Sequence, residues 1–259
     1  MADAGDEVLY ARVGRIGVAT LNRPHARNAV NGALAARMEA IVDEIEADSD
    51  VWAAILASSS DRTFCAGADL KEVAAGIDAM TTTRGGFAGF VDAHRRKPWI
   101  AAVTGSALGG GLELALACDM IVAGESTVLG LPEVRRSLLA GAGGVYRLPR
   151  AVPRHVGLEM VATGRPISAQ QALAFGLVNR IAPDAQVLDA ALELAGQVAE
   201  NPPQAVQESL QIARQHADLS DASLRDLTRA AYDRMRGSLD YQEGPRAFIE
   251  KRSPRWLGR

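Results

Sequence analysis

Cysteine is scarce in this chain of 259 residues, which contains only Cys65 and Cys118. Two cysteines without a CxxC pair or a cysteine–histidine cluster exclude a disulfide framework and argue against a structural zinc site. The four histidines, at positions 25, 94, 155 and 216, have no partner at ligand spacing, so we expect no metal. Cys65 has no base near it in sequence and is expected to be a small packed residue rather than a nucleophile.

Aromatic residues and excess positive charge are also missing. Aromatic side chains make up 5% of the chain, and the formal net charge is −3. Nucleic-acid-binding surfaces need clustered positive charge and rings that stack on bases. We therefore expect neither nucleic acid nor an anionic membrane as a partner.

Long apolar runs do not occur. No stretch approaches the roughly 18 apolar residues of a membrane-spanning helix, because Glu113 and Asp119 interrupt the best candidate. The first ten residues, MADAGDEVLY, are acidic and lack the basic-then-apolar pattern of a signal peptide. These features, with the low cysteine content, favour a soluble cytoplasmic protein.

Several signatures of common enzyme classes are absent. The sequence contains no GxxxxGK[ST], GxGxxG, HExxH or GxSxG motif. Nothing in it indicates a metal or a redox cofactor, so the chemistry has to be sought elsewhere.

Short apolar strands alternate with helices in the first two thirds of the chain. β-Branched runs at 8–13 and 16–21 flank Gly14-Arg15 and predict a hairpin. Apolar residues at helical spacing predict an amphipathic helix from Asn31 to Asp48. Short buried strands are expected at 51–57, 100–104, 120–123, 127–129 and 177–181. Strands separated by helices predict an α/β core with parallel pairing.

The last part of the chain changes to helices alone. Ser168 with Gln171 fits a capping box. Asn201, followed by two prolines, predicts a helix start, and Ser220 opens a further helix. We therefore expect an α/β core over residues 1–198 and a helical region over 199–259.

Two glycine-rich turns each follow a buried strand. One is CAGADL at 65–70, and the other is Gly109-Gly110-Gly111. Where a turn opens a helix, free N–H groups point outward and attract negative charge. Two such turns facing one pocket would supply two N–H donors to one oxygen, as an oxyanion hole requires. From spacing alone, tight turns with close packing explain the glycines as well.

Two glutamates occupy unusual positions. Glu113 is the only charged residue between Lys97 and Asp119 and has apolar neighbours. Glu133 follows a Leu-Pro pair in a loop. Burying a carboxylate is costly unless it is paired or functional, and two glutamates near one pocket can divide acid and base roles. Glu113 could instead be a simple cap, because a helix start favours negative charge.

The basic C-terminal stretch 248–256, FIEKRSPRW, has two interpretations. Charge runs are usually solvated tails. The alternative is a site for the phosphate groups of a ligand.

Taken in order, these residues resemble the enoyl-CoA hydratase/isomerase family, the crotonase superfamily. The similarity covers nearly the whole chain and is specific. Its motifs are Asn22-Arg23-Pro24, Asn28-Ala29, the turn at 64–70, the segment 105–114, Cys118-Asp119, Leu131-Pro132-Glu133, the glycines of 141–144, Arg147-Leu148-Pro149 and the stretch 248–252. The resemblance implies an α/β fold, a crotonase-like spiral of repeated ββα units, followed by a C-terminal α-helical region that builds trimers, often paired into hexamers.

The resemblance also implies an acyl-CoA thioester substrate and assigns roles to residues. The N–H groups of Ala68 and Gly110 would form the oxyanion hole on the thioester oxygen. Glu113 would hold and activate water, and Glu133 would handle the proton at the α-carbon. Substrate and CoA contacts are expected from Arg27, Ala29, Ala66, Asp69, Leu70, Gly109, Phe248 and Lys251. Coenzyme A is part of the substrate, and no other cofactor is implied.

Both glutamates together favour an enoyl-CoA hydratase, a hydro-lyase. An isomerase or another acyl-CoA lyase on the same scaffold is the alternative, and a non-catalytic acyl-CoA-binding protein is a third. Dehydration of a 3-hydroxyacyl-CoA, including the carnitinyl-CoA type, is the same kind of step reversed. The segment 76–90 is expected to border the acyl pocket, with Phe87 and Phe90 as walls. Acyl length, pathway and the choice between trimer and hexamer stay open.

Overall fold

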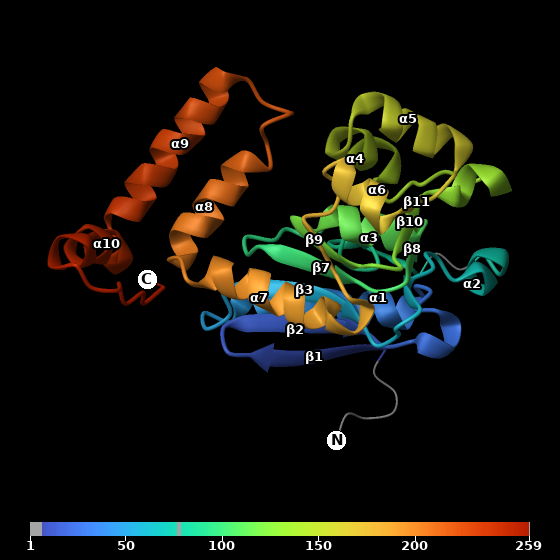
Figure 1. Ribbon diagram of the computed structural model, residues 1–259, viewed down its shortest axis with the longest axis horizontal. Coiled ribbons are helices and arrows are strands. Elements are labelled where there is room, and N and C mark those ends of the chain that lie inside the picture. The colour runs from blue at the N-terminus through green and yellow to red at the C-terminus, as the bar shows by residue number, and fades with distance from the viewer. Residues whose placement is uncertain (1–6, 77–78, 259) are drawn as a thin grey trace.

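The larger of two main sheets forms the base of the molecule. The structure, a computed structural model, describes residues 7–76 and 79–258. Six strands lie in the order β1-β2-β3-β7-β9-β12 (Figure 1). The predicted hairpin is confirmed, because β1 pairs antiparallel with β2, and the remaining neighbours are parallel. The strands are β1 (Val8–Val13), β2 (Ile16–Leu21), β3 (Ala53–Ser58), β7 (Trp99–Val103), β9 (Met120–Gly124) and β12 (Arg180–Ala182).

A smaller sheet lies beside it with the strand order β11-β10-β8-β4. Its strands are β4 (Thr63–Cys65), β8 (Ser106–Leu108), β10 (Val128–Gly130) and β11 (Ile167–Ser168). The first three run parallel, and β11 pairs antiparallel with β10. A separate two-stranded ribbon joins β5 (Thr81–Thr82) and β6 (Gly86–Phe87).

Successive units of the chain each add one strand to each sheet. β3 and β4 are followed by α2 (Leu70–Ala74), and β7 and β8 by α3 (Gly110–Ala117). β9 and β10 are followed by the 3-10 helix η2 (Pro132–Arg136) and by α4 (Gly144–Ala151). Because each unit places its strands beside those of the previous unit in both sheets, the chain winds into the expected crotonase-like spiral.

This winding brings three distant segments to one edge of the smaller sheet. In the parallel pairs, Cys65 of β4 lies opposite Ala107 of β8, and Gly130 of β10 lies opposite Leu108. The chain therefore leaves β4, β8 and β10 at the same edge. Ligands of α/β proteins commonly bind outside the carboxyl ends of parallel strands.

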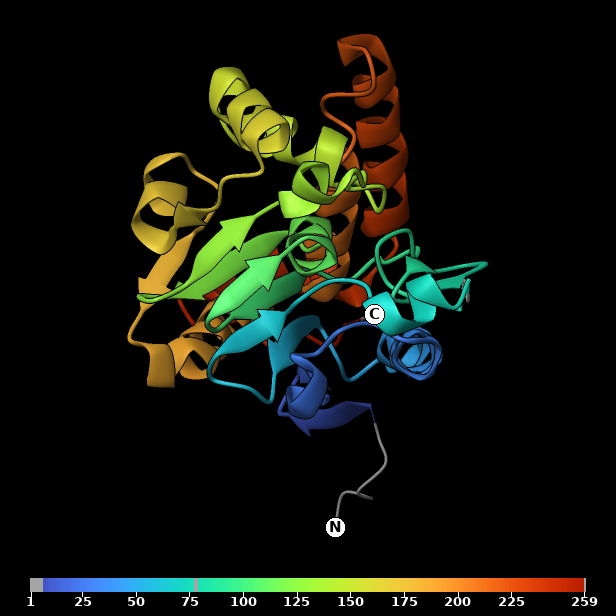
Figure 2. The same ribbon diagram turned by 90° about the vertical axis from the view of Figure 1, so that its right-hand side faces the viewer.

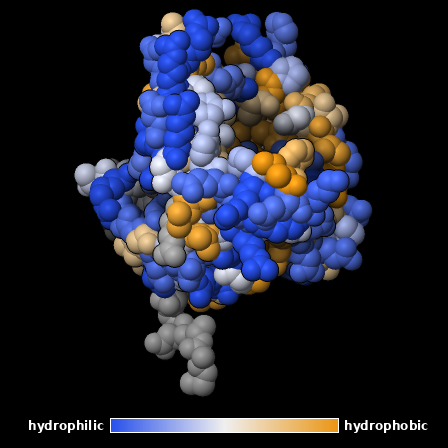
Figure 3. All heavy atoms as spheres, turned by 90° about the vertical axis from the view of Figure 1, so that its left-hand side faces the viewer, coloured by the Kyte–Doolittle hydropathy of each residue, from blue (hydrophilic) through white to orange (hydrophobic). Residues whose placement is uncertain are grey.

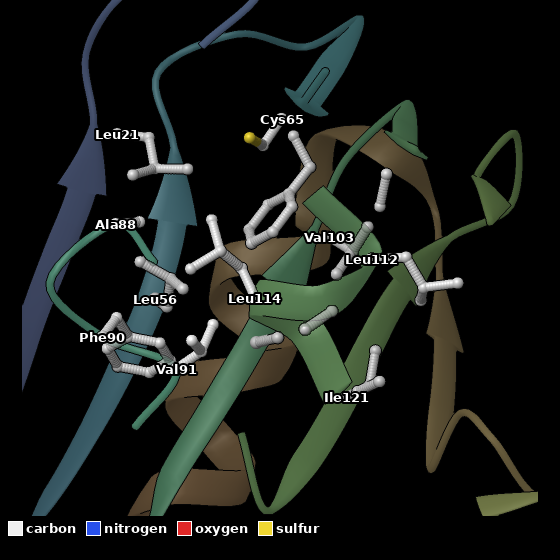
Figure 4. Close-up of a cluster of buried hydrophobic side chains, with 14 of the residues drawn as sticks. Leu21, Leu56, Cys65, Ala88, Phe90, Val91, Val103, Leu112, Leu114 and Ile121 are labelled. Atoms are coloured by element: carbon white, nitrogen blue, oxygen red, sulfur yellow. The ribbon is translucent and has the colours of Figure 1, made fainter. Parts of the chain in front are cut away.

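Helices cover both faces of the larger sheet. On one face, the main core packs against α1 (Gly32–Ala47) and α3. Leu112 and Leu114 of α3 belong to the same cluster as Leu21 and Leu56 of the sheet, and Leu114 extends toward Leu56 (Figure 4). On the other face, Ile55 and its neighbours pack against α7 (Val187–Ala199). Side chains alternate between the faces because a strand has a period of two residues.

Local capping signals were mostly correct. Asn31 accepts from the backbone N–H of Leu34 at the start of α1, and Ser168 with Gln171 forms the predicted capping box. The remaining helices of the core are α5 (Arg154–Thr163), α6 (Ala169–Ala174), and the 3-10 helices η1 (Pro24–Ala26) and η3 (Asp184–Gln186). Figure 2 shows α2 beside α1 on one side of the sheets and α5 with α6 on the other.

The predicted strand at 177–181 needs correction. Its first residues lie in the turn that follows α6, since the N–H groups of Leu177 and Val178 bond to the carbonyl of Ala172. Only β12, from Arg180 to Ala182, pairs with β9.

Three helices follow α7: α8 (Pro203–Ala213), α9 (Asp221–Arg236) and α10 (Leu239–Glu250). They extend away from the sheets and carry the C-terminal end (Figure 1). Ser220 caps α9 as predicted, but Asn201 does not cap α8. Its amide instead bonds back to the carbonyl of Gln197 in α7. The division of the chain at residues 198 and 199 stays a prediction.

The face that includes α9 and α10 is largely hydrophilic, with separate hydrophobic patches (Figure 3). Within residues 7–76 and 79–258, no helix has both the length and the apolar composition of a membrane span. The same residues contain no group of three or more histidine, cysteine, aspartate or glutamate side chains placed to bind a metal.

Candidate active site

A cavity of about 810 Å³ opens at the edge where the three segments meet. Both glycine turns and both glutamates line it, and its remaining wall is mainly apolar. The predicted site residues in the lining are Arg27, Ala66, Ala68, Leu70, Gly109, Gly110, Glu113 and Glu133. Residues from distant parts of the sequence, from Arg27 to Glu133, are thus brought to one concave surface, the usual form of a ligand site.

The two glycine turns touch each other through their backbones. A Cβ atom at Gly67 would lie 2.9 Å from the amide nitrogen of Gly110, and one at Gly111 would lie 2.0 Å from the carbonyl oxygen of Cys65. Any side chain at these positions would push the turns apart. Glycine is therefore what allows the two turns to face the cavity side by side.

Ala68 and Gly110 present free amide groups to this cavity. The hydrogen bonds of the described residues include none donated by the N–H of either residue. Val30 pairs with the flanking residues, since its N–H bonds to Gly67 and its carbonyl accepts from Asp69. Because successive N–H groups of extended backbone point to opposite sides, the N–H of Ala68 points away from Val30. The arrangement can donate two hydrogen bonds to one oxygen.

Glu113 lies in the first turn of α3 and is 4% exposed. Its Oε1 accepts a hydrogen bond of 2.8 Å from the N–H of Gly144. Burial raises the pKa of Glu113 to about 7. The N–H groups of Gly144 and Ala142 and the charge of Arg147 oppose the shift, while the charge of Glu133 adds to it. The carboxyl can therefore exchange a proton near neutral pH.

Glu133 enters the cavity from η2, after β10. A Cβ at Gly109 would lie 3.0 Å from its Oε1, so this carboxyl borders the second glycine turn. Its Oε2 is buried and has no hydrogen-bond partner among the described residues. Burial raises the pKa of Glu133, opposed by its own backbone N–H and by Arg136. A buried, unpartnered carboxyl oxygen that borders a cavity is available to a ligand.

Of the two carboxyls, one influences the other: the charge of Glu133 adds to the rise in the pKa of Glu113. Burial raises both pKa values. A pair that carries one proton contains both an acid and a base, which is the state needed to add or remove water.

Four predicted contact residues lie outside the cavity lining. The carbonyl of Ala29 accepts a hydrogen bond from the guanidinium of Arg23, and Asp69 caps α2. Phe248 lies on α10, where it is 85% exposed, and Lys251 follows that helix. Their role toward CoA stays a prediction.

Of the two expected phenylalanine walls, only one lines the cavity. Phe87 lies in the lining, and its ring would be 2.7 Å from a Cβ at Gly110. Phe90 is fully buried and packs edge-on against Trp99 with ring centroids 5.0 Å apart. Its assignment as a wall was therefore wrong. Residues 77 and 78 of this segment lie outside the described residues.

Sequence reasoning missed the partner of Glu113. The glycines of 141–144 entered the sequence analysis only as part of the family resemblance, and nothing in them identified the N–H of Gly144 as the donor. The apolar residues Leu138, Leu139 and Ala142, which also line the cavity, were not anticipated either.

Comparisons with known proteins agree with this geometry. The family model described as enoyl-CoA hydratase/isomerase matches residues 12–259. The chain is 40% identical over 258 residues to 2,3-dehydroadipyl-CoA hydratase of Escherichia coli K12, with 98% of this chain and 99% of the relative covered. It is 40% identical over 245 residues to carnitinyl-CoA dehydratase of Proteus mirabilis, with 92% and 94% covered.

Among solved structures, an enoyl-CoA hydratase from Mycobacterium tuberculosis superimposes with a TM-score of 0.93 at 39% identity, covering 98% of this chain and 100% of the other. The full-length match, the shared fold and the two glycine turns at one cavity lead to one conclusion. The chain belongs to the enoyl-CoA hydratase/isomerase family.

Proposed function

We propose that this protein is an enoyl-CoA hydratase, which reversibly adds water across the 2,3 double bond of a 2-enoyl-CoA thioester. The observation that carries the proposal is the meeting of two free N–H groups, the buried Glu113 and the half-buried Glu133 in one cavity. Relatives named as hydratases and dehydratases support the same reaction class.

The thioester oxygen binds between the N–H groups of Ala68 and Gly110. When water attacks the β-carbon, the electrons of the double bond move toward the carbonyl, and negative charge develops on this oxygen. Preorganised donors stabilise that charge more than the neutral ground state, and losing one typically costs about 3–4 kcal/mol of activation free energy.

The glutamates transfer the protons. Glu113, as the carboxylate, accepts a proton from the attacking water, whose oxygen forms the new bond to the β-carbon. Glu133, as the acid, gives its proton to the α-carbon, and the enolate collapses to the 3-hydroxyacyl thioester. The N–H of Gly144 favours the charged form of Glu113, whereas Glu133 Oε2 has no donor among the described residues. This contrast supports the assignment.

The CoA portion lies outside the reacting centre. Arg27, Ala66, Leu70 and Gly109 line the cavity and are proposed to contact the substrate. Ala29, Asp69, Phe248 and Lys251 are further proposed contacts. The scheme involves only acid–base and electrostatic catalysis, so it requires no cofactor besides the CoA of the substrate.

The proposed protein partners are further copies of the same chain, which assemble into a trimer or a dimer of trimers. Phe248 and Ile249 of α10 are 85% and 78% exposed, and large exposed apolar side chains that lie together often mark interfaces. Both cysteines are free, which fits the proposed cytoplasmic location.

The alternative is an isomerase or another acyl-CoA lyase. An isomerase moves a proton between two carbons and needs no water-activating group. The buried Glu113, held by Gly144, therefore favours the hydratase. Dehydration of a 3-hydroxyacyl-CoA, as in the relatives named carnitinyl-CoA dehydratase, uses the same groups in reverse.

Incubation with a panel of 2-enoyl- and 3-enoyl-CoAs, followed by mass analysis, tests the proposal. We expect 2-enoyl-CoAs to gain the mass of one water. Conversion of 3-enoyl- to 2-enoyl-CoA without any water gain would support the isomerase instead. Binding without turnover across the whole panel would indicate a non-catalytic protein.

A further inference from the structure

We propose that Asn28 is a positioning residue for the oxyanion hole. Its side chain fixes the segment 27–30 against the smaller sheet, and this segment sets the direction of the Ala68 N–H. The inference concerns the arrangement of the donor. Its consequence for turnover rests on the proposed hydratase function.

The segment 27–30 contacts the donor turn on both sides of Ala68. The N–H of Val30 bonds to the carbonyl of Gly67 at 2.8 Å, and its carbonyl accepts from the N–H of Asp69 at 2.9 Å. The N–H of Ala66 bonds to the carbonyl of Arg27 at 3.1 Å. A shift of this segment would therefore rotate the peptide that carries the Ala68 N–H.

The side chain of Asn28 ties that segment to two strands. It is fully buried. The two hydrogens of its Nδ2 are shared among three acceptors, Ser58 Oγ at 2.8 Å, the carbonyl of Phe64 at 3.0 Å and that of Thr63 at 3.3 Å. Its Oδ1 accepts from the N–H of Arg23 at 2.7 Å. One amide thus bonds to the end of β3, to β4 and to its own loop.

The backbone of Asn28 also contacts the donor turn. Cys65 Sγ donates to the carbonyl of Asn28 at 3.1 Å and accepts from the N–H of Gly67 at 3.3 Å. Burial raises the pKa of Cys65 to about 12, so the thiol keeps its proton and can donate. Asn28 is therefore linked to the turn through its main chain as well as through its side chain.

The local backbone conformation requires such support. Arg27 and Asn28 have φ angles of 52° and 53°, in the left-handed region. Two consecutive non-glycine residues in that region are unfavourable by about 1 kcal/mol or more each, although asparagine tolerates it better than most residues. The hydrogen bonds of the Asn28 amide hold the loop in this conformation.

The test must separate positioning from stability, because replacing any buried, hydrogen-bonded amide destabilises a fold by about 1–3 kcal/mol. The probe is butyryl-CoA with ¹³C at the thioester carbonyl, which has no double bond to hydrate. Hydrogen bonds to the thioester oxygen lower the stretching frequency of the C=O bond. Isotope-edited infrared spectroscopy measures this frequency in the bound ligand. Thermal melting identifies the variants that are folded.

The variant is Asn28→Ala, and Asn179→Ala is a control that removes a hydrogen-bonded but exposed amide away from the cavity. Asn179 Oδ1 accepts from the N–H of Ile121 at 2.8 Å between β9 and β12, and Asn179 is absent from the cavity lining. In the wild type and in Asn179→Ala, we expect the carbonyl stretching frequency of butyryl-CoA to fall clearly when it binds. In Asn28→Ala we expect most of that downshift to be lost. The kcat for crotonyl-CoA should fall by about 10²-fold, the usual effect of a misplacement near 1 Å, with KM changed much less.

A folded Asn28→Ala variant with the wild-type downshift and kcat overturns the proposal. If Asn28→Ala does not fold, Ser58→Ala removes one of its hydrogen bonds, and an unchanged downshift in that variant overturns the proposal equally. A wild type that polarises butyryl-CoA but hydrates no enoyl-CoA refutes the hydratase function while leaving the positioning role testable. A wild type that binds butyryl-CoA without any downshift refutes the oxyanion hole and the positioning role together.

Discussion

The carboxylate of Glu113 accepts its hydrogen bond from the backbone N–H of Gly144, the first residue of α4. The donor lies 31 residues further along the chain. The amide group at a helix start stabilises negative charge, whereas burial of the carboxyl opposes it. These two effects keep Glu113 close to the point at which it gains or loses a proton near neutral pH.

Replacing Glu113 with glutamine should remove the base that activates water. We expect Glu113→Gln to lower kcat for crotonyl-CoA by about 10²–10⁴-fold, the usual contribution of a general base. Binding of the saturated butyryl-CoA should change little, because the oxyanion donors remain. Glu125→Gln, an exposed glutamate outside the cavity, is the matched control and should retain full activity. Equal turnover by both variants would contradict the role of Glu113.

The same substitution should change the dependence of stability on pH. Because the folded-state pKa of Glu113 is raised, its protonated form stabilises the fold, and this contribution is lost as pH rises through about 7. Glu113→Gln has no proton to lose. Urea unfolding at pH 6 and pH 8 should therefore show a smaller loss of unfolding free energy for the variant than for the wild type. An identical pH dependence would mean that Glu113 is not buried as described.

Arg147 should shift the pH profile of the reaction, although burial is the main cause of the raised pKa of Glu113. Its Nη1 donates to the carbonyl of Ala142 at 2.9 Å, and its charge lowers the pKa of Glu113. Hydration requires the charged base, so kcat/KM should rise with pH through about 7. Arg147→Met removes the positive charge and should move this rise to higher pH. Arg147→Lys keeps the charge and should move it less. Superimposable profiles for the three proteins would contradict this electrostatic role.

A methyl group at Gly111 should separate the two glycine turns. Its Cβ would lie 2.0 Å from the carbonyl oxygen of Cys65, a backbone atom that cannot move away alone. We expect Gly111→Ala to cost about 1–3 kcal/mol or more of unfolding free energy, as overpacking does, and to lower kcat. Gly196→Ala in α7 is the control, because no atom lies within 4 Å of its added Cβ. It should raise stability by about 0.5–1 kcal/mol. Equal melting temperatures would refute the close approach.

The exposed apolar end of α10 should be an interface. Light scattering is expected to give a mass three or six times the 27.3 kDa of one chain. Phe248→Glu should shift the protein to smaller species, because a buried charge opposes association. Leu158→Glu on α5, where the side chain is 42% exposed, is the control. A monomeric wild type, or a Phe248→Glu variant of unchanged mass, would contradict the assignment.

The local elements followed from the sequence because their causes are local. The hydrogen bonds of Ser168 and Ser220 to N–H groups three residues later depend only on nearby backbone. Asn201 failed as a cap because its amide bonds to the preceding helix, an alternative that spacing alone does not distinguish. Phe90 was misplaced for a different reason: both it and Phe87 are apolar, and only packing against Trp99 decides which ring faces the core.

By itself, the sequence determined several helices, many strands and the order of motifs that identifies the family, because periodicity and motif spacing are properties of neighbouring residues. Only the tertiary structure decided which groups meet. Ala68 and Gly110 become neighbours through the parallel pairing of β4 with β8, and Glu133 joins them through β10. The donor to Glu113 comes from a separate helix. Parallel strands need a crossover between them, so these contacts span distances in sequence that no local pattern records.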